Sequence, residues 1–339
     1  MILDDRKIRN IVEHFDVGEL SKVVKALNSG FQSDNYHIRT NKGEYVLRFI
    51  YDSVRNVEYI MEVYDYFADH GIKTSKPVTT KEGTFSLLYE DNVIVVQSFI
   101  PGTYYETLDK IDSVLSFYGR ELGRIHQVSI QMVKEKGEKR LSAKPWDTIS
   151  YVIEASEEYM PENEYIRQQY EKWEHEINSL PKNQLTMAVI HGDVGPKDFL
   201  FKDGNYMGII DFNAAHFDFL LFDIAPMMMY CDLYQPERKR QYYDFITAYL
   251  EEAPVTKAEL KWLHLILRTR WLLQILYHQS RYEEGITKGS ETGQVEENLN
   301  GVRDGENFLK ITCKTSKEFY FKGLGEQEIT SVTKPTTYE

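Results

Sequence analysis

Four acidic residues lie within one short part of the chain, each next to a predicted strand. Residues 191–198 read HGDVGPKD and contain Asp193 and Asp198, an apolar run then ends at Asp211, and Asp223 follows. Phosphoryl transfer uses such a set, since one carboxylate orients the attacking hydroxyl and other oxygens hold the Mg²⁺ ions that neutralise nucleotide phosphates. The five-residue step from Asp193 to Asp198 matches the spacing of base and metal ligand in a catalytic loop. A lone aspartate near a strand end is ordinarily a turn or cap residue, so the prediction depends on the combination.

This block resembles the aminoglycoside phosphotransferase and choline kinase superfamily, whose catalytic loop carries His-Gly-Asp with an Asn five residues after the Asp. The resemblance implies an α+β, two-lobed, protein-kinase-like fold with a small antiparallel-sheet lobe and a larger, mainly helical lobe. It implies ATP as the phosphoryl donor, Asp193 as the catalytic base, and Asp198 and Asp211 as ligands of Mg²⁺. By the same resemblance Asp223 would brace the catalytic loop, and His191 would fix the geometry of that loop.

Two positions depart from the family pattern. Asp198 stands where the family has Asn, and Phe212-Asn213 replaces a Phe-Gly pair. An aspartate still offers an oxygen to Mg²⁺, but its added negative charge should strengthen metal binding and repel the nearby phosphates. Weakened turnover or an altered metal preference are the two consequences that this replacement leaves open.

The N-terminal third supplies candidates for nucleotide binding. Strands are predicted over 23–27 and 35–40, and the loop between them contains Ser29, Gly30 and Ser33. Small and polar residues there can bring backbone N–H groups onto phosphate oxygens, although an ordinary hairpin turn accounts for the same residues. The loop is similar to the Gly-to-Asn-Tyr loop of type II homoserine kinases.

Arg48 lies on a third predicted strand, over 44–50, where the kinase-like fold has a phosphate-binding Lys. An arginine can serve there because it is permanently charged and forked, although an exposed strand arginine is commonplace. Its partner on the following helix is predicted to be Glu58 rather than Glu62, because Glu58 lies closer to the apolar face of the helix. A solvated helix face accounts for either glutamate.

The segment after the last N-terminal strand is predicted to be the hinge between the lobes. Gln97, Phe99 and Ile100 would offer backbone groups to adenine, a prediction that depends on their position alone. The nucleotide-binding lobe is therefore predicted over 1–100, and the helical lobe with the catalytic loop and acceptor site over 101–339.

Apolar periodicity predicts the elements that position these residues. The predicted helices span 5–15, 55–70, 110–128, 162–179, 236–251 and 257–282, and further strands span 84–89, 92–99, 187–190, 198–202 and 206–210. The polar stretch 285–305, which contains several glycines, is predicted to be a loop or linker, and whether it covers the site as a lid is open.

Four residues are candidates for lining an acceptor pocket for an amine-bearing substrate: Asp218, Asp232, Trp271 and Tyr277. Packing on a helix face explains the two aromatic residues equally well. Within the superfamily, the parts of the chain around these residues look closest to homoserine kinase type II.

Composition narrows the classes of partner. Lys and Arg number 40 against 53 Asp and Glu, and a net charge of −13 without a basic run disfavours nucleic acid and anionic membranes. The acidity suits a cationic substrate, but it also serves solubility. Cys231 and Cys313 have no metal-type spacing, and no signal peptide or membrane span is predicted, so we expect a cytoplasmic protein. The oligomeric state is not predicted.

The combined prediction is an ATP-dependent phosphotransferase that moves the γ-phosphoryl group to a hydroxyl of a small amine-containing molecule of the aminoglycoside, homoserine or amino-alcohol type. An alternative is a nucleotide-binding pseudokinase or a structural coat-type protein without turnover, because Asp198 and Arg48 are both unorthodox. A regulatory module that binds sugars or amines is a third possibility.

Overall fold

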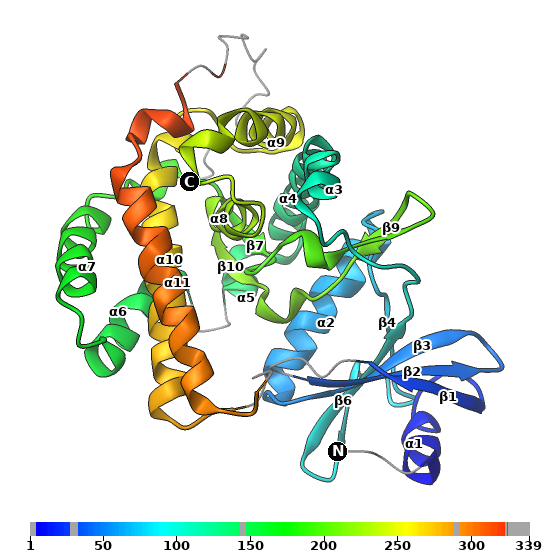
Figure 1. Cartoon of the computed structure of the whole chain (residues 1–339). Helices are drawn as coiled ribbons and strands as arrows, with labels where there is room; N and C mark the ends of the chain where they lie inside the picture. Colours follow the sequence, from blue (N-terminus) through cyan, green and yellow to red (C-terminus); the bar gives the residue numbers. More distant parts are fainter. Residues whose placement is uncertain (1–4, 28–32, 143–146, 288–291, 323, 325–339) are drawn as a thin grey trace.

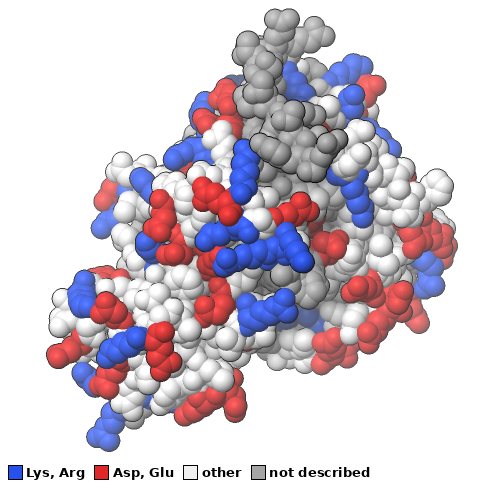
Figure 2. Space-filling view, turned by 180° about the vertical axis from the view of Figure 1, so that it is seen from behind, with Lys and Arg blue, Asp and Glu red and all other residues white. Residues whose placement is uncertain are grey.

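The computed structural model describes residues 5–27, 33–142, 147–287, 292–322 and 324 of the 339-residue chain. An antiparallel sheet forms the N-terminal part, and helices dominate the remainder (Figure 1). This arrangement confirms the predicted α+β class with a sheet followed by a larger helical part. Seen from the opposite side (Figure 2), acidic and basic side chains are interspersed over both parts of the molecule.

The N-terminal sheet runs in the order β1-β2-β3-β6-β4, with β5 paired to β6, and every pair is antiparallel. Its strands are β1 (Leu20–Ala26), β2 (Ser33–Thr40), β3 (Glu44–Ile50), β4 (Pro77–Val78), β5 (Ser86–Tyr89) and β6 (Asn92–Ser98). Helices α1 (Asp5–Val12) and α2 (Val54–Asp69) cover its two faces.

The side chains of strand β6 pack in two separate hydrophobic cores, one on each face of the sheet. Ile94 and Val96 pack in a small core with residues of α1, whereas Val93 and Val95 belong to the main core together with α2 and the helical part. Successive strand residues point to opposite faces, so a continuous apolar run is required where both faces are buried.

The helical part is built around one long helix, α10 (Leu263–Glu283), which packs with α6, α7, α8 and α11. Two short antiparallel pairs, β7 (Met187–Ile190) with β10 (His216–Phe219) and β8 (Phe199–Lys202) with β9 (Asn205–Ile209), interrupt the helices. The other helices are α3 (Leu108–Asp112), α4 (Leu115–Lys136), α5 (Glu138–Leu141), α6 (Thr148–Tyr159), α7 (Glu164–Ile177), α8 (Leu221–Tyr230), α9 (Lys239–Glu252) and α11 (Asn298–Lys314). None of the described helices is both long and apolar enough to cross a membrane.

The prediction that 285–305 is a loop is wrong for residues 298–305, because α11 begins at Asn298. Two of the glycines that suggested a linker, Gly301 and Gly305, allow α11 to lie close to α10. A Cβ atom at Gly301 would lie 2.2 Å from the His278 ring, and one at Gly305 would lie 2.6 Å from Ile275 Cγ1. Close packing of two helices, rather than chain flexibility, explains these residues.

Gly119 makes the same kind of contact between α4 and α9, and its replacement tests the packing. A Cβ atom there would lie 2.3 Å from the carbonyl oxygen of Phe245 and 2.9 Å from the amide nitrogen of Tyr249. These are backbone atoms, which cannot move away as the end of a flexible side chain can. We expect Gly119→Ala to lower the free energy of unfolding by about 1–3 kcal/mol, measured by urea denaturation. The control Lys134→Ala, on the exposed side of α4, should change it by less than about 0.5 kcal/mol. Equal stability of the two variants would contradict this account of the α4–α9 contact.

Candidate active site

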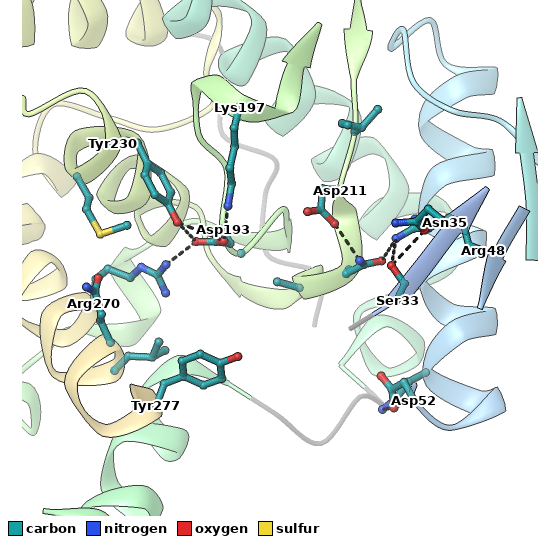
Figure 3. Close-up of a pocket in the computed structure, with 18 of the residues that line it drawn as sticks. Ser33, Asn35, Arg48, Asp52, Asp193, Lys197, Asp211, Tyr230, Arg270 and Tyr277 are labelled. Atoms are coloured by element: carbon teal, nitrogen blue, oxygen red, sulfur yellow. Dashed lines mark hydrogen bonds and ion pairs between the residues drawn. The ribbon is translucent and has the colours of Figure 1, made fainter. Parts of the chain in front are cut away.

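A cleft of about 1380 Å³ is lined by residues from both parts of the chain. The N-terminal part contributes Asn35, Arg48 and Gln97, and the helical part contributes Asp193, Lys197, Asp211 and residues of α10 such as Arg270 and Tyr277. Figure 3 shows Asp193 and Asp211 on neighbouring loops, with the Arg48 group on one side and α10 on the other.

The loop after β7 is held from behind by Asp223, in the first turn of α8. Its carboxylate is fully buried and accepts the backbone N–H groups of His191 and Gly192, both at 2.7 Å, while His126 lies at 3.1 Å. Burial alone would raise the pKa of Asp223, but the hydrogen bond and charge of His126, followed by His191, hold that pKa below its ordinary value. Asp223 therefore fixes the backbone that presents Asp193.

His191 and Gly192 shape the same loop. The Nε2 atom of His191 lies 2.9 Å from the carbonyl oxygen of Ile210, and the ring packs on Phe212. Gly192 has a φ of +86°, and a Cβ atom there would lie 2.4 Å from the carbonyl oxygen of Ala214. Only glycine fits this position, which brings the loop of Asp193 close to the loop that follows Asp211.

Asp193 is 35% exposed and is surrounded by donors. Arg270 of α10 contacts its Oδ1 atom at 2.5 Å, Lys197 contacts Oδ2 at 3.2 Å, and the Tyr230 hydroxyl donates to Oδ1 at 3.1 Å. Burial works to lower the pKa of Lys197, but Asp193 and the neighbouring acidic groups outweigh it and raise that pKa. Lys197 therefore stays protonated beside Asp193.

Asp198 and Asp211 are the two candidate metal ligands. Asp198 is buried, and its Oδ2 atom accepts the Gly195 N–H at 2.7 Å. Burial, with the carboxylates of Asp211 and Asp193, raises the pKa of Asp198 well above its ordinary value. Asp211 lines the cleft and accepts a hydrogen bond from Asn213 at 2.8 Å. Among the described residues no group of three or more His, Cys, Asp or Glu could hold a metal ion, so these two carboxylates would need further ligands from elsewhere.

The structure does not pair Arg48 with Glu58. Arg48 instead bonds to four neutral side chains, with Asn35 at 3.1 Å, Gln97 at 3.1 Å, Asn213 at 3.0 Å and Ser33 at 3.4 Å. This corrects the predicted helix partner.

Glu58 faces the edge strand β5, where its carboxylate accepts the backbone N–H groups of Ser86 at 2.7 Å and Phe85 at 3.4 Å. Glu62 forms ion pairs with Lys136 and Arg140. Apolar periodicity identified the buried side of α2, but it could not show which edge of the sheet Glu58 would meet.

Only some of the other residues predicted to bind the nucleotide line the cleft. Ser33 and Gln97 line the cleft, whereas Ser29 and Gly30 lie outside the described residues. Phe99 and Ile100 do not line the cleft. The Phe99 ring stacks on His37, and its N–H group donates to the Glu44 carbonyl, so that group is not free for adenine in this structure.

Of the four acceptor candidates, only Tyr277 lines the cleft. Asp218 is buried under α6, where it accepts the N–H of Thr148 at 2.9 Å, and Asp232 lies outside the cleft in the turn after α8. Trp271 is fully buried and donates to Thr312 at 2.8 Å. These three predictions are corrected because the side chains belong to caps, turns and the core of the helical part.

Residues not singled out from the sequence line the part of the cleft beside α10 and α11. They include Arg270, Gln274 and His278 of α10 and Asp304 of α11. Helical periodicity predicted α10, but no local motif marks which of its polar residues face Asp193. Asp304 was missed because its helix was predicted to be a loop.

Known proteins similar to this chain are phosphotransferases and kinases. The chain matches the Phosphotransferase enzyme family over residues 23–263. A homoserine kinase of Rhodopseudomonas palustris (strain TIE-1) is 22% identical over 317 residues, which cover 88% of this chain and 94% of that protein. A homoserine kinase of Gluconobacter oxydans (strain 621H) is 26% identical over 218 residues, which cover 62% of this chain and 66% of that protein.

Solved structures show the same fold. An amicoumacin kinase in complex with AMP-PNP, Ca²⁺ and Ami has a TM-score of 0.70 at 18% identity, covering 93% of this chain and 95% of that chain. A choline/ethanolamine kinase family protein from Mesorhizobium loti has a TM-score of 0.65 at 12% identity, covering 94% of this chain and 98% of that chain. The resemblance inferred from the sequence is thus confirmed. The chain belongs to the Phosphotransferase enzyme family, as a relative of small-molecule kinases.

Proposed function

We propose that this protein moves the γ-phosphoryl group of ATP to a hydroxyl of a small amine-containing molecule. The observation that carries the proposal is that Asp193 and Asp211, on neighbouring loops, line one cleft of about 1380 Å³. Ordinary ligand sites measure roughly 300–1,000 Å³, so this cleft has room for a nucleotide and an acceptor together.

Asp193 is the proposed catalytic base. It accepts the proton of the acceptor hydroxyl while that oxygen attacks the γ-phosphorus in line. The new bond joins the acceptor oxygen to phosphorus, the bond from phosphorus to the bridging oxygen breaks, and ADP leaves with the electron pair. A carboxylate has about four lone-pair positions, so Asp193 can accept this hydroxyl while it keeps contacts with Arg270 and Lys197.

Asp198 and Asp211 fit a divalent cation such as Mg²⁺. The Gly195 N–H occupies one oxygen of Asp198, which leaves the other for a metal, and Asp211 faces the cleft. Mg²⁺ usually takes one or two carboxylates and completes its octahedron with phosphate oxygens and water, which suits a site with two protein carboxylates. When bound, the cation would neutralise part of the negative charge of the nucleotide phosphates.

Arg270 and Asp304 favour an acceptor that carries one negatively and one positively charged group. Arg270 reaches Asp193, so an acceptor that approaches the base meets a cation, and Asp304 lines the same end of the cleft. A hydroxy amino acid offers a carboxylate for Arg270 and an ammonium group for Asp304, whereas Arg270 would repel a polycationic aminoglycoside. The homoserine kinase relatives support this choice.

A protein without turnover is the alternative, and two observations favour it. The Arg270–Asp193 ion pair occupies one oxygen of the base, and Asp198 adds a charge where the family has a neutral amide. Incubation of ATP and Mg²⁺ or Mn²⁺ with homoserine, choline, ethanolamine and aminoglycosides decides between them. The absence of a phosphorylated product with every acceptor would favour the alternative.

Asp193→Asn tests the base. We expect kcat to fall by about 10²–10⁴-fold, because the amide cannot take the proton, with little change in melting temperature. ADP release coupled to acceptor phosphorylation is the measurement, and Asp91→Asn, in the exposed turn between β5 and β6, is the matched control. Retained turnover in Asp193→Asn would remove this residue from the mechanism.

Asp198→Asn tests the departure from the family pattern. Loss of one carboxylate charge should raise the Mg²⁺ concentration for half-maximal activity, by roughly tenfold, since ligand charge sets the affinity of oxygen sites for such cations. The measurement is a Mg²⁺ titration at fixed ATP, with the exposed Asp109→Asn as control. An unchanged Mg²⁺ requirement would mean that Asp198 does not contact the metal.

Arg270→Gln tests the acceptor. With homoserine as substrate we expect KM to rise about 10–100-fold, the effect of losing one charge-assisted hydrogen bond, while KM for ATP stays unchanged. The control is Arg120→Gln, on the exposed side of α4. The proposed role of Arg270 fails if KM for homoserine is unaffected, or if KM for ATP rises in parallel.

A further inference from the structure

A second hollow, of about 600 Å³, lies on the helical part between α7, α10 and α11. We call it the basic groove, and its charged lining residues are Lys172, Glu176, Arg268, Lys310, Lys314 and Lys317. None of the residues that line it also lines the active-site cleft. On α10, Arg268 faces the groove and Arg270 faces the cleft, because two helix positions are separated by about 200°. The groove is therefore a separate site.

The groove gathers positive charge in an acidic protein. Five cationic side chains and one carboxylate line it, although the whole chain carries a net charge of −13. Glu176 is already paired with Arg268 at 3.0 Å and with Lys317 at 3.3 Å. Lys172 and Lys314 have no ion pair within the described part of the chain. A bound anion would give both lysines a partner of opposite charge.

Two buried side chains on the floor of the groove, Arg268 and His264, each have one polar atom without a hydrogen-bond partner among the described residues. Arg268 is only 3% exposed, and within the described ranges its Nε atom has no hydrogen-bond partner. His264 beside it is also buried. Its Nε2 atom bonds to the Thr312 carbonyl at 3.0 Å, and its Nδ1 atom has no partner among these residues. Buried polar atoms without partners are uncommon in folded proteins, and they are frequently explained by a water, ion or ligand.

We propose that the basic groove binds a compact oxyanion that carries two or more negative charges, of the phosphate or small polycarboxylate type. Lys172 and Lys314 supply the uncompensated charge at the rim, and Arg268 supplies the buried cation at the floor. A long polyanion such as nucleic acid would meet the acidic remainder of the surface. A small anion responds mainly to charges within the screening length of about 10 Å, and five of the six charged side chains that line the groove are basic.

The test uses the full chain with inorganic phosphate and citrate as probes, compared with chloride at the same ionic strength. Binding is measured by calorimetric titration and by the shift in melting temperature. We expect at least one of the two probes to bind and to raise the melting temperature, and the double variant Lys172→Gln/Lys314→Gln to weaken that binding by about tenfold or more. Both lysines are exposed, so the variant should fold.

Two control variants distinguish the groove from the rest of the surface and from the active-site cleft. Lys22→Gln/Lys202→Gln removes the same charge from exposed positions outside the groove and should leave binding unchanged. Arg48→Gln alters the active-site cleft and should also leave it unchanged. The proposal is overturned if neither probe binds beyond chloride, if both lysine double variants weaken binding equally, or if only Arg48→Gln removes it.

Discussion

Three carboxylates converge where the two parts of the chain meet, and their mutual repulsion is the constraint on which the site depends. Lys197 offsets the charges of Asp193, Asp198 and Asp211 together, and those charges outweigh burial in raising its pKa. Arg270 adds a second cation to Asp193. Arg270 of α10 and Lys197 within the loop thus offset two of the three negative charges.

The backbone that carries these charges is fixed from two sides. Asp223 holds the loop of Asp193 through two backbone N–H groups. The hydroxyl of Tyr64, on α2, accepts the N–H groups of Asp211 at 2.9 Å and Phe212 at 3.1 Å. Asp211 has a φ of +70°, in the left-handed region that a residue other than glycine adopts only where its surroundings hold it. Because one brace comes from the helical part and the other from the N-terminal part, the distance between the carboxylates depends on how the two parts pack.

Site residues that lie close together in the sequence could be predicted from it. Site residues whose place depends on which side of a helix faces the cleft could not. Asp193, Asp198, Asp211 and Asp223 lie within one stretch, so their types and spacing were visible together. Arg270 contacts Asp193 from 77 positions away, and nothing near it in sequence indicates which side of α10 it occupies. Trp271, one position on, points into the core. The glycines of α11 suggested a linker because composition alone cannot distinguish a flexible segment from closely packed helices.

Opposite sides of helix α10 line two charged sites, the active-site cleft and the basic groove. Arg270 is paired with Asp193 in the cleft, and Arg268 is paired with Glu176 in the basic groove. The helix is also locked against α11, since Gly301 and Gly305 leave no space between the two helices for a side chain. A rotation of α10 that improved one arginine contact would disturb the other and would bring α11 into collision. The position of Arg270 beside Asp193 is therefore set in part by contacts that α10 makes outside the cleft.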